Sequence, residues 1–224
     1  MLTSPFGTQQ ETPQFNLEAY DNAQVVFVSD MYSSEYTGGA ELTTDAIVDS
    51  SNLNCFRLKS QQLSTDLIQR GTAKHWVFCN YTGMDPQLIP VVIANLSYSI
   101  VEYDYKFCKY RSIEKHENAE ETPCDCHDNM QGKLTSAFFH GSDNTFWMSF
   151  KQSERYMERF PFLRGGNNHV LSSVFTEDIL DRLEVLRNEY TENKNNKWLV
   201  IGSTSWIKGA EAAESYCKEN NLEY

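Results

Sequence analysis

The chain has 224 residues, of which 40% are hydrophobic and 13% aromatic, so it can bury the core of one or two domains. Its net charge of −12 disfavours nonspecific binding to a nucleic-acid backbone, and no run reaches the ~18 apolar residues that a membrane-spanning helix needs. The N-terminus lacks the basic-then-apolar pattern of a secretory signal, so we expect a cytoplasmic location.

The pattern of apolar residues predicts alternating strands and helices after a polar leader at residues 1–23. The predicted strands span residues 24–29, 54–58, 75–80, 98–103, 145–150, 168–174 and 197–202. The predicted helices span residues 39–49, 64–70, 86–95, 133–139, 152–159 and 177–189. This alternation predicts an α/β, Rossmann-like fold, in which helices cover both faces of a mostly parallel sheet. Ligands of such folds bind outside the carboxyl ends of the strands, so the loops after Ser29, Tyr103 and Gly202 become candidate sites.

A domain boundary is predicted in the most polar stretch, "NEYTENKNNK", at residues 188–197. Residues 24–190 would then form the Rossmann-like domain, while residues 191–224 would supply one strand, a loop and one helix. A single strand–helix unit cannot bury its own apolar faces. It must pack onto the first sheet or begin a second domain.

Two motifs lie far apart in the chain. "TGGAE" opens the first predicted helix after the leader, and "VIGSTSWIKGAEAAESYCKE" joins a predicted strand to a helix through a loop that ends in Lys-Gly. Together they resemble the GT-B glycosyltransferases, specifically the retaining group that includes relatives of sucrose and glycogen synthases. The resemblance implies two Rossmann-like domains facing a cleft, in which a sugar passes from a nucleotide-sugar donor to an acceptor without a required cofactor.

The resemblance also assigns roles to individual residues. Gly38 and Gly39 would lie near the donor phosphates, which agrees with the affinity of helix N-termini for anions. Lys208 with Gly209 would contact the donor pyrophosphate, and Asp104 would lie in the catalytic cleft.

The sequence departs from the family pattern near its end. No Arg precedes Lys208 by a few residues, and the later Glu-x7-Glu segment that holds the donor ribose and sugar is absent. We therefore interpret residues 191–224 as the start of an incomplete donor domain, which a second chain or another copy of this chain would complete.

Simpler interpretations exist for the same residues. Gly38-Gly39 is also what a strand-to-helix turn with positive φ would need, and Lys208 alone would be an ordinary surface lysine. Glu41, in the first turn of the predicted helix, favours the helix dipole rather than acid catalysis.

The insertion at residues 107–133 is rich in metal-binding side chains. Cys108, Cys124, Cys126 and His127 are four candidate ligands, with His116 as a fifth. Zinc binds four such side chains in a tetrahedron and would staple a long loop that has little core of its own. The spacing differs from the usual Cys-x2-Cys knuckle, so unpaired thiols are the other interpretation.

Three functional hypotheses follow. The first is a glycosyltransferase-like protein that uses a nucleotide-sugar donor. The second is a non-catalytic α/β binding or assembly module, stapled by zinc. The third, an oxidoreductase that uses a dinucleotide, is disfavoured because the full Gly-x-Gly-x-x-Gly pattern is missing after the first strand.

Overall fold

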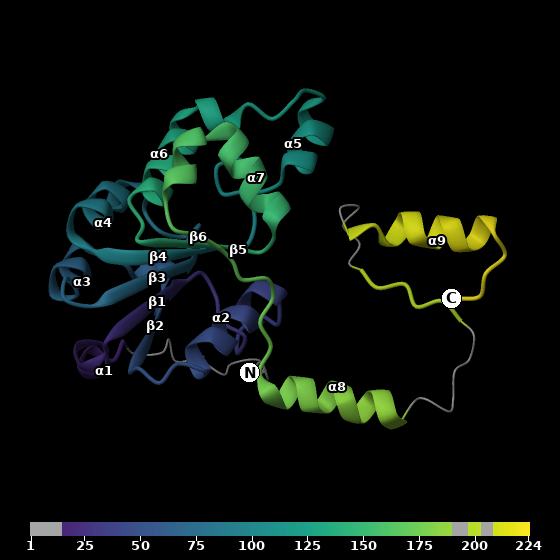
Figure 1. Cartoon of the computed structure of the whole chain (residues 1–224), viewed down its shortest axis with the longest axis horizontal. Coiled ribbons are helices and arrows are strands. Elements are labelled where there is room, and N and C mark those ends of the chain that lie inside the picture. Colours follow the sequence, from purple (N-terminus) through teal and green to yellow (C-terminus); the bar gives the residue numbers. More distant parts are fainter. Residues whose placement is uncertain (1–14, 190–196, 203–207) are drawn as a thin grey trace, which may run out of the picture.

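The computed structural model describes residues 15–189, 197–202 and 208–224. They include one six-stranded sheet with helices packed against it, whereas the helices at residues 177–189 and 210–219 lie apart from the sheet (Figure 1). All five strand pairs of this sheet are parallel, which confirms the predicted α/β class. The strands are β1 (Val25–Ser29), β2 (Cys55–Lys59), β3 (His75–Asn80), β4 (Ser97–Glu102), β5 (Asn144–Trp147) and β6 (Asn168–Val170).

The helices begin and end close to the predicted bounds, and a few were not predicted. The α-helices are α1 (Leu17–Asn22), α2 (Gly39–Asp49), α3 (Thr65–Arg70), α4 (Ile89–Asn95), α5 (Ile113–Glu120), α6 (Met130–His140), α7 (Phe150–Arg159), α8 (Glu177–Glu189) and α9 (Ala210–Glu219). The 3-10 segments are η1 (Ser60–Gln62), η2 (Pro86–Leu88), η3 (Cys126–Asp128) and η4 (Pro161–Gly165).

The strand order is β2-β1-β3-β4-β5-β6, so the sheet grows in opposite directions from β1. The loops that leave β1 and β3 at their carboxyl ends therefore diverge to opposite sides. Folds wound in this way open a crevice at such a point, outside the carboxyl ends of the strands. The topology draws attention to the loops after β1, β3 and β4.

Aromatic side chains fill the larger core, which lies between one face of the sheet and α3, α4, α6 and α7 (Figure 1). Phe138 of α6 stacks on Tyr98 of β4 with ring centroids 4.9 Å apart, and both rings are fully buried. The opposite face carries a smaller cluster that includes Val25, Phe27 and Val101, and α2 packs there through Val48. Because successive residues of a strand point to opposite faces, strands with both faces covered need apolar residues throughout.

The predicted leader is wrong at its end, because residues 17–22 form α1. Asn16 caps this helix by accepting a hydrogen bond from the Ala19 amide at 3.0 Å. Tyr20 is fully buried, and its hydroxyl donates to the Leu67 carbonyl at 2.5 Å. One aromatic side chain thus anchors a segment that looks merely polar; residues 1–14 lie outside the described part of the chain.

The strand predicted at residues 197–202 is also wrong. This segment carries no strand and makes one backbone hydrogen bond to the end of the chain, from the Trp198 amide to the Glu223 carbonyl at 2.8 Å. Leu199 and Ile201 are 82% and 78% exposed. An apolar run forms a strand only beside a neighbouring strand, and the described residues offer none here. Most of the predicted boundary falls on residues 190–196, which lie outside the described ranges.

None of the helices in the described ranges is long and apolar enough to cross a bilayer.

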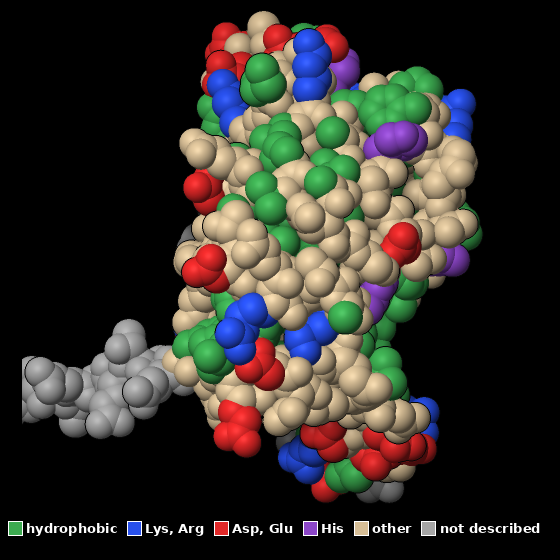
Figure 2. Space-filling view, turned by 90° about the vertical axis from the view of Figure 1, so that its left-hand side faces the viewer, with side chains coloured by type: hydrophobic (Ala, Val, Ile, Leu, Met, Phe, Trp, Pro, Cys, Tyr) green, Lys and Arg blue, Asp and Glu red, His purple; other side chains and the backbone are tan. Residues whose placement is uncertain are grey.

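On the face shown in Figure 2, the Lys and Arg side chains lie among acidic ones, mainly towards its upper and lower ends.

Candidate functional site

Asp30 joins the loops that diverge at the carboxyl ends of β1 and β3. Its carboxylate accepts hydrogen bonds from the amides of Thr82 and Gly83, at 3.1 and 2.8 Å, and from the hydroxyl of Ser60. The acid at the end of the first strand therefore ties three loops together. Both of its carboxylate oxygens already accept hydrogen bonds from groups of the protein.

The two glycines of "TGGAE" begin α2 as predicted, but without positive φ. Gly38 is the N-cap residue, with φ −113° and ψ 164°, which is extended backbone. A Cβ atom on Gly38 would lie 2.4 Å from the Glu41 carboxylate and 2.7 Å from the Tyr36 ring. Glu41 is 5% exposed. The space that this glycine leaves free thus accommodates a carboxylate of the chain, and an anionic ligand would have to face that charge.

A buried ion pair stands at the carboxyl end of β4. Glu102 is fully buried, and its carboxylate accepts hydrogen bonds from the Lys106 ammonium at 2.9 Å and the Tyr156 hydroxyl at 2.8 Å. The Lys106 ammonium also donates to Asp104 at 3.4 Å. Arg111 donates to Asp104 and Asn80, in each case at 2.6 Å. Four charges and one amide thus hold the start of the loop after β4 against β3.

Burial and neighbouring charge shift the two acids of this cluster in opposite directions. Burial raises the pKa of Glu102 to about 7, although Lys106 opposes the shift. Burial also acts to raise the pKa of Asp104, but the positive charges of Lys106 and Arg111 outweigh it, so this pKa is lowered. Asp104, the predicted cleft residue, is therefore an ionised partner of two cations.

A hollow of about 820 Å³ lies beside the same loop. Asp104, Arg111 and Lys115 line it, and so does Lys208 from the segment before α9. Gly209 is the N-cap of α9 and has a left-handed φ of 73°, which a side chain would disfavour. The structure thus brings together Lys208 and Asp104, two of the predicted site residues. Gly38 and Gly39 are not among the described residues that line this hollow.

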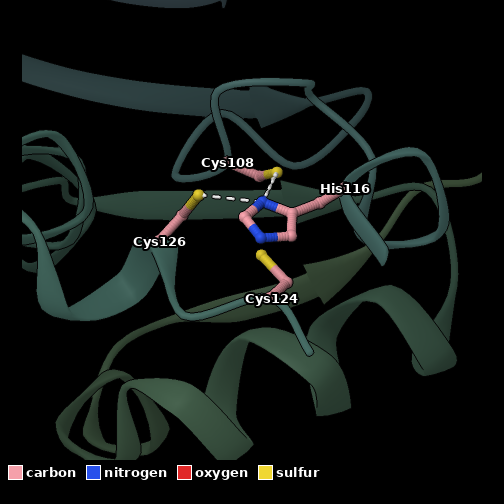
Figure 3. A group of neighbouring side chains, drawn as sticks. All are labelled: Cys108, His116, Cys124 and Cys126. Carbon is pink, nitrogen blue, oxygen red and sulfur yellow. Dashed lines mark hydrogen bonds between the residues drawn. The ribbon is translucent and has the colours of Figure 1, made fainter. Parts of the chain in front are cut away.

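Cys108, His116, Cys124 and Cys126 form a compact group, and all four are buried. Their ligand atoms lie within 4.8 Å of one another. Figure 3 shows the four side chains pointing toward a common centre, with the His116 Nδ1 atom 3.3 Å from the Cys126 sulfur and 3.8 Å from the Cys108 sulfur. This group could bind a metal ion.

The donor set fits a tetrahedral ion. With metal–sulfur bonds of about 2.3 Å, the ligand atoms of a tetrahedral site lie roughly 3–4 Å apart, which is close to the spacing already present. Burial raises the pKa of Cys124 to about 12, and the nearby thiols of Cys108 and Cys126 add to the shift. Burial also raises the pKa of Cys108. Without a metal these two thiols stay protonated at neutral pH, whereas binding would displace their protons.

Local structure explains how four residues from a long insertion meet. Ser112 caps α5 by accepting a hydrogen bond from the Lys115 amide at 3.2 Å, and this helix then buries His116 on its second turn. Cys126 begins η3, which packs against α6 at Gly132. A Cβ atom on Gly132 would lie 2.2 Å from the carbonyl oxygen of Cys126, so only glycine permits this approach.

The predicted metal ligand His127 lies outside the group, and His116 takes its place. The His127 ring faces Phe160, with centroids 6.3 Å apart, and its Nε2 atom lies 3.5 Å from the Asp128 carboxylate. Adjacent residues such as Cys126 and His127 project in different directions from a helical turn, so they rarely face one centre. The choice of histidine depends on α5, a helix that the sequence analysis did not predict.

The sequence analysis did not identify three charged residues at the end of β4 and in the loop after it, namely Glu102, Lys106 and Arg111. Glu102 is an acid within an otherwise apolar run. A charged residue inside a buried strand must find a partner, so this position was a detectable signal. The five charged residues interleaved with aromatic ones in "EYDYKFCKYR" were a second detectable signal.

No family model, curated protein or solved structure matches the chain.

The first prediction concerns the buried pair at the end of β4. Replacing Lys106 with Met should lower the free energy of unfolding by about 3–5 kcal/mol at pH 8, because Glu102 would lose its cation and have to stay buried as an unpaired carboxylate or take up a proton. The loss should be smaller at pH 5.5, because Glu102, whose pKa is raised to about 7, is then mostly protonated and needs no cation. The folded state holds this proton more tightly than the unfolded state, so the contribution of Glu102 to the stability of the wild-type chain falls as the pH rises through about 7. Urea unfolding at both pH values measures this.

A double-mutant cycle with Glu102→Gln provides the control for that prediction. The double variant E102Q/K106M should be less destabilised than Lys106→Met alone at pH 8, because neither charge remains. An equal loss in both variants, or a loss that does not change with pH, would contradict an ion pair that governs this loop.

The second prediction concerns the close approach at Gly132. Gly132→Ala should reduce bound metal to less than half of its wild-type content, because the new Cβ would displace the Cys126 backbone. It should also destabilise the fold by roughly 1–3 kcal/mol. Gly165→Ala is the matched control, since a Cβ there meets no atom within 4 Å. Elemental analysis and thermal unfolding compare the two, and equal metal content in both variants would contradict a site whose geometry depends on this approach.

Proposed function

We propose that the chain is a glycosyltransferase-like protein, which binds a nucleotide-sugar donor in the hollow between the loop after β4 and Lys208. The sugar would pass from this donor to an acceptor. The observation that carries the proposal is the shared hollow of about 820 Å³, in which Lys208 lies with Asp104 and Arg111. Two segments that are separated by about half of the sequence there offer complementary groups to one ligand.

The chemistry of this hollow suits a diphosphate. Lys208 would neutralise charge on the leaving nucleoside diphosphate, and Arg111 would add a second cation from the opposite wall. The N-terminus of α9 follows Lys208 directly and presents backbone amides that favour an anion. Asp104 would then orient Arg111, to which it is paired, and contact the acceptor.

The proposal includes a completing partner. The segment 197–202 and α9 expose apolar side chains such as Leu199 and Ile201. A second chain, or another copy of this chain, would supply the rest of the donor domain and cover these side chains. The acceptor and the donor sugar are left open by this assignment.

We further propose that the ion of the Cys108, His116, Cys124 and Cys126 group is a structural zinc. Three thiols and one imidazole match zinc chemistry, and four protein ligands leave no open position for a reacting water. Zinc bound to this group would hold the insertion at residues 107–133 in one conformation. None of the six cysteines forms a disulfide, which is consistent with a reducing, cytoplasmic location.

A second candidate function is a non-catalytic α/β binding or assembly module, stapled by the same zinc. The buried cysteine and histidine group favours it, because such a site stabilises a fold without providing a reaction. The two functions differ in whether the hollow binds a nucleotide.

The third prediction tests nucleotide binding. Uridine or guanosine diphosphate should bind the full chain in isothermal titration calorimetry, either alone or with a candidate partner chain present. Lys208→Met should weaken this binding by about tenfold, because a cation that faces the diphosphate is lost.

Lys218→Met is the matched control for that titration. Lys218 lies in α9, the helix that follows Lys208, pairs with Glu214 and has a 65% exposed side chain, so its loss should leave the affinity unchanged. The glycosyltransferase proposal fails if neither diphosphate binds, or if both variants bind as the wild type does.

The fourth prediction separates the alternative function. Elemental analysis of the purified chain should find one zinc ion per chain under either function. For the non-catalytic module, native mass spectrometry should also find a stable complex and calorimetry should find no diphosphate binding. Absence of zinc, or its replacement by disulfides, would rule out the staple.

A further inference from the structure

A second cavity, of about 520 Å³, lies at the carboxyl ends of β3 and β4 and has no role in the proposed function. It is bounded by the loop after β3, by η2 with α4, by the first half of α6, and by the loop after β4. Its volume is within the range of about 300–1,000 Å³ that is typical of sites for small molecules.

The charges that line this cavity all have one sign. Lys106, Lys109 and Arg111 line it, and the described lining residues include no carboxylate, although the whole chain carries a net charge of −12. Each cation forms an ion pair with an acid that does not line this cavity. Lys106 pairs with Glu102 at 2.9 Å, Lys109 pairs with Glu120 at 2.7 Å, and Arg111 pairs with Asp104. Such an arrangement fixes the cations in place and favours an anionic ligand.

Most of the remaining cavity wall is apolar, apart from Thr82, Gln131 and Thr135. Met84, Pro86 and Ile89 line one side, and Met130 and Leu134 of α6 line the other. Inorganic phosphate alone would leave these side chains uncovered. An apolar body attached to the anion would cover them and gain the free energy of burial.

Tyr81 adds a polar group without a partner. It follows β3, is 6% exposed and lines the cavity, and its hydroxyl makes no hydrogen bond. The Lys106 ammonium lies over its ring, 5.2 Å from the centroid. Buried hydroxyls nearly always have a partner, so this unpartnered hydroxyl in a residue of the cavity wall is unusual.

The three cations belong to one short turn built around Cys108. The Cys108 amide donates to the Tyr105 carbonyl, and the Arg111 amide donates to the Cys108 carbonyl, each at 2.8 Å. Arg111 has a left-handed φ of 56°, which is unfavourable for a residue with a side chain. Backbone held in this way at the rim of a cavity is characteristic of ligand sites.

We propose that this cavity binds a small organic phosphate with an aromatic or similarly compact apolar body. The phosphate lies against Lys109 and Arg111, and the apolar body lies between Met84, Ile89 and Leu134. Tyr81 forms part of the wall. The site is separate from the nucleotide hollow, although Arg111 lines both.

Phenyl phosphate is the probe that tests this site, measured by calorimetry on the full, zinc-loaded chain. It should bind at least about tenfold more tightly than inorganic phosphate or phenol, because only the joined molecule contacts both parts of the cavity. Binding should persist in Lys208→Met, which separates this site from the nucleotide hollow. Equal affinities for phenyl phosphate and inorganic phosphate, or no binding at millimolar concentration, would overturn the proposal.

Paired variants locate the probe. Lys109→Met should weaken phenyl phosphate about fivefold or more, whereas Lys115→Met, in the wall of the other hollow, should leave it unchanged. Leu134→Trp should abolish binding by filling the cavity, and Met130→Trp, at an 80% exposed position on the same wall, serves if the first variant does not fold. Circular dichroism and metal content confirm folding. Wild-type affinity in Lys109→Met, or in a folded tryptophan variant, would overturn the assignment.

Discussion

The loop after β4 depends on one buried ion pair, between Glu102 and Lys106. A carboxylate at the end of a strand with no exposed surface must find a cation, and the chain supplies one four residues later. The pair therefore fixes the start of the loop to the end of the strand. Asp104, Cys108 and Arg111 all lie in this loop. A metal ligand and parts of the walls of two cavities thus belong to the segment that the pair anchors.

The cysteine and histidine group compensates for what the insertion lacks. Between β4 and α6 the chain has a short helix, a 3-10 turn and several exposed acids, and besides the cysteines it adds only a few buried apolar side chains, such as Phe107 and Ile113, to the main core. Four buried ligand atoms can be held by one ion, and the stabilisation then comes from coordination rather than from packed side chains. Cys108 connects this stabilised region to the turn that carries the three cations. The proposed zinc and the proposed ligand site are therefore neighbours in sequence as well as in space.

The distribution of charge distinguishes the two places where an anion was expected. At the N-terminus of α2, the buried carboxylate of Glu41 occupies the space beside Gly38, so that end of the sheet already carries a negative charge. In the smaller cavity after β4 the cations line the wall, and the acids that pair with them do not. An acidic chain can thus present a local positive field. The proposed organic phosphate site depends on this separation, whereas Asp104 and Glu114 line the diphosphate hollow beside its cations; both sites use Arg111.

The sequence by itself determined the α/β class, because buried parallel strands need continuous apolar runs and their helices need periodic ones. β3, α2 and α8 occupy the residues that those patterns predicted. Periodicity could not show that the apolar run at 197–202 lacks a neighbouring strand, nor that Tyr20 anchors α1. It also could not choose between His116 and His127, since both lie near cysteines in the chain. Only the tertiary structure decided these points, because hydrogen-bond partners, burial and metal geometry join residues whose separation along the chain carries no period.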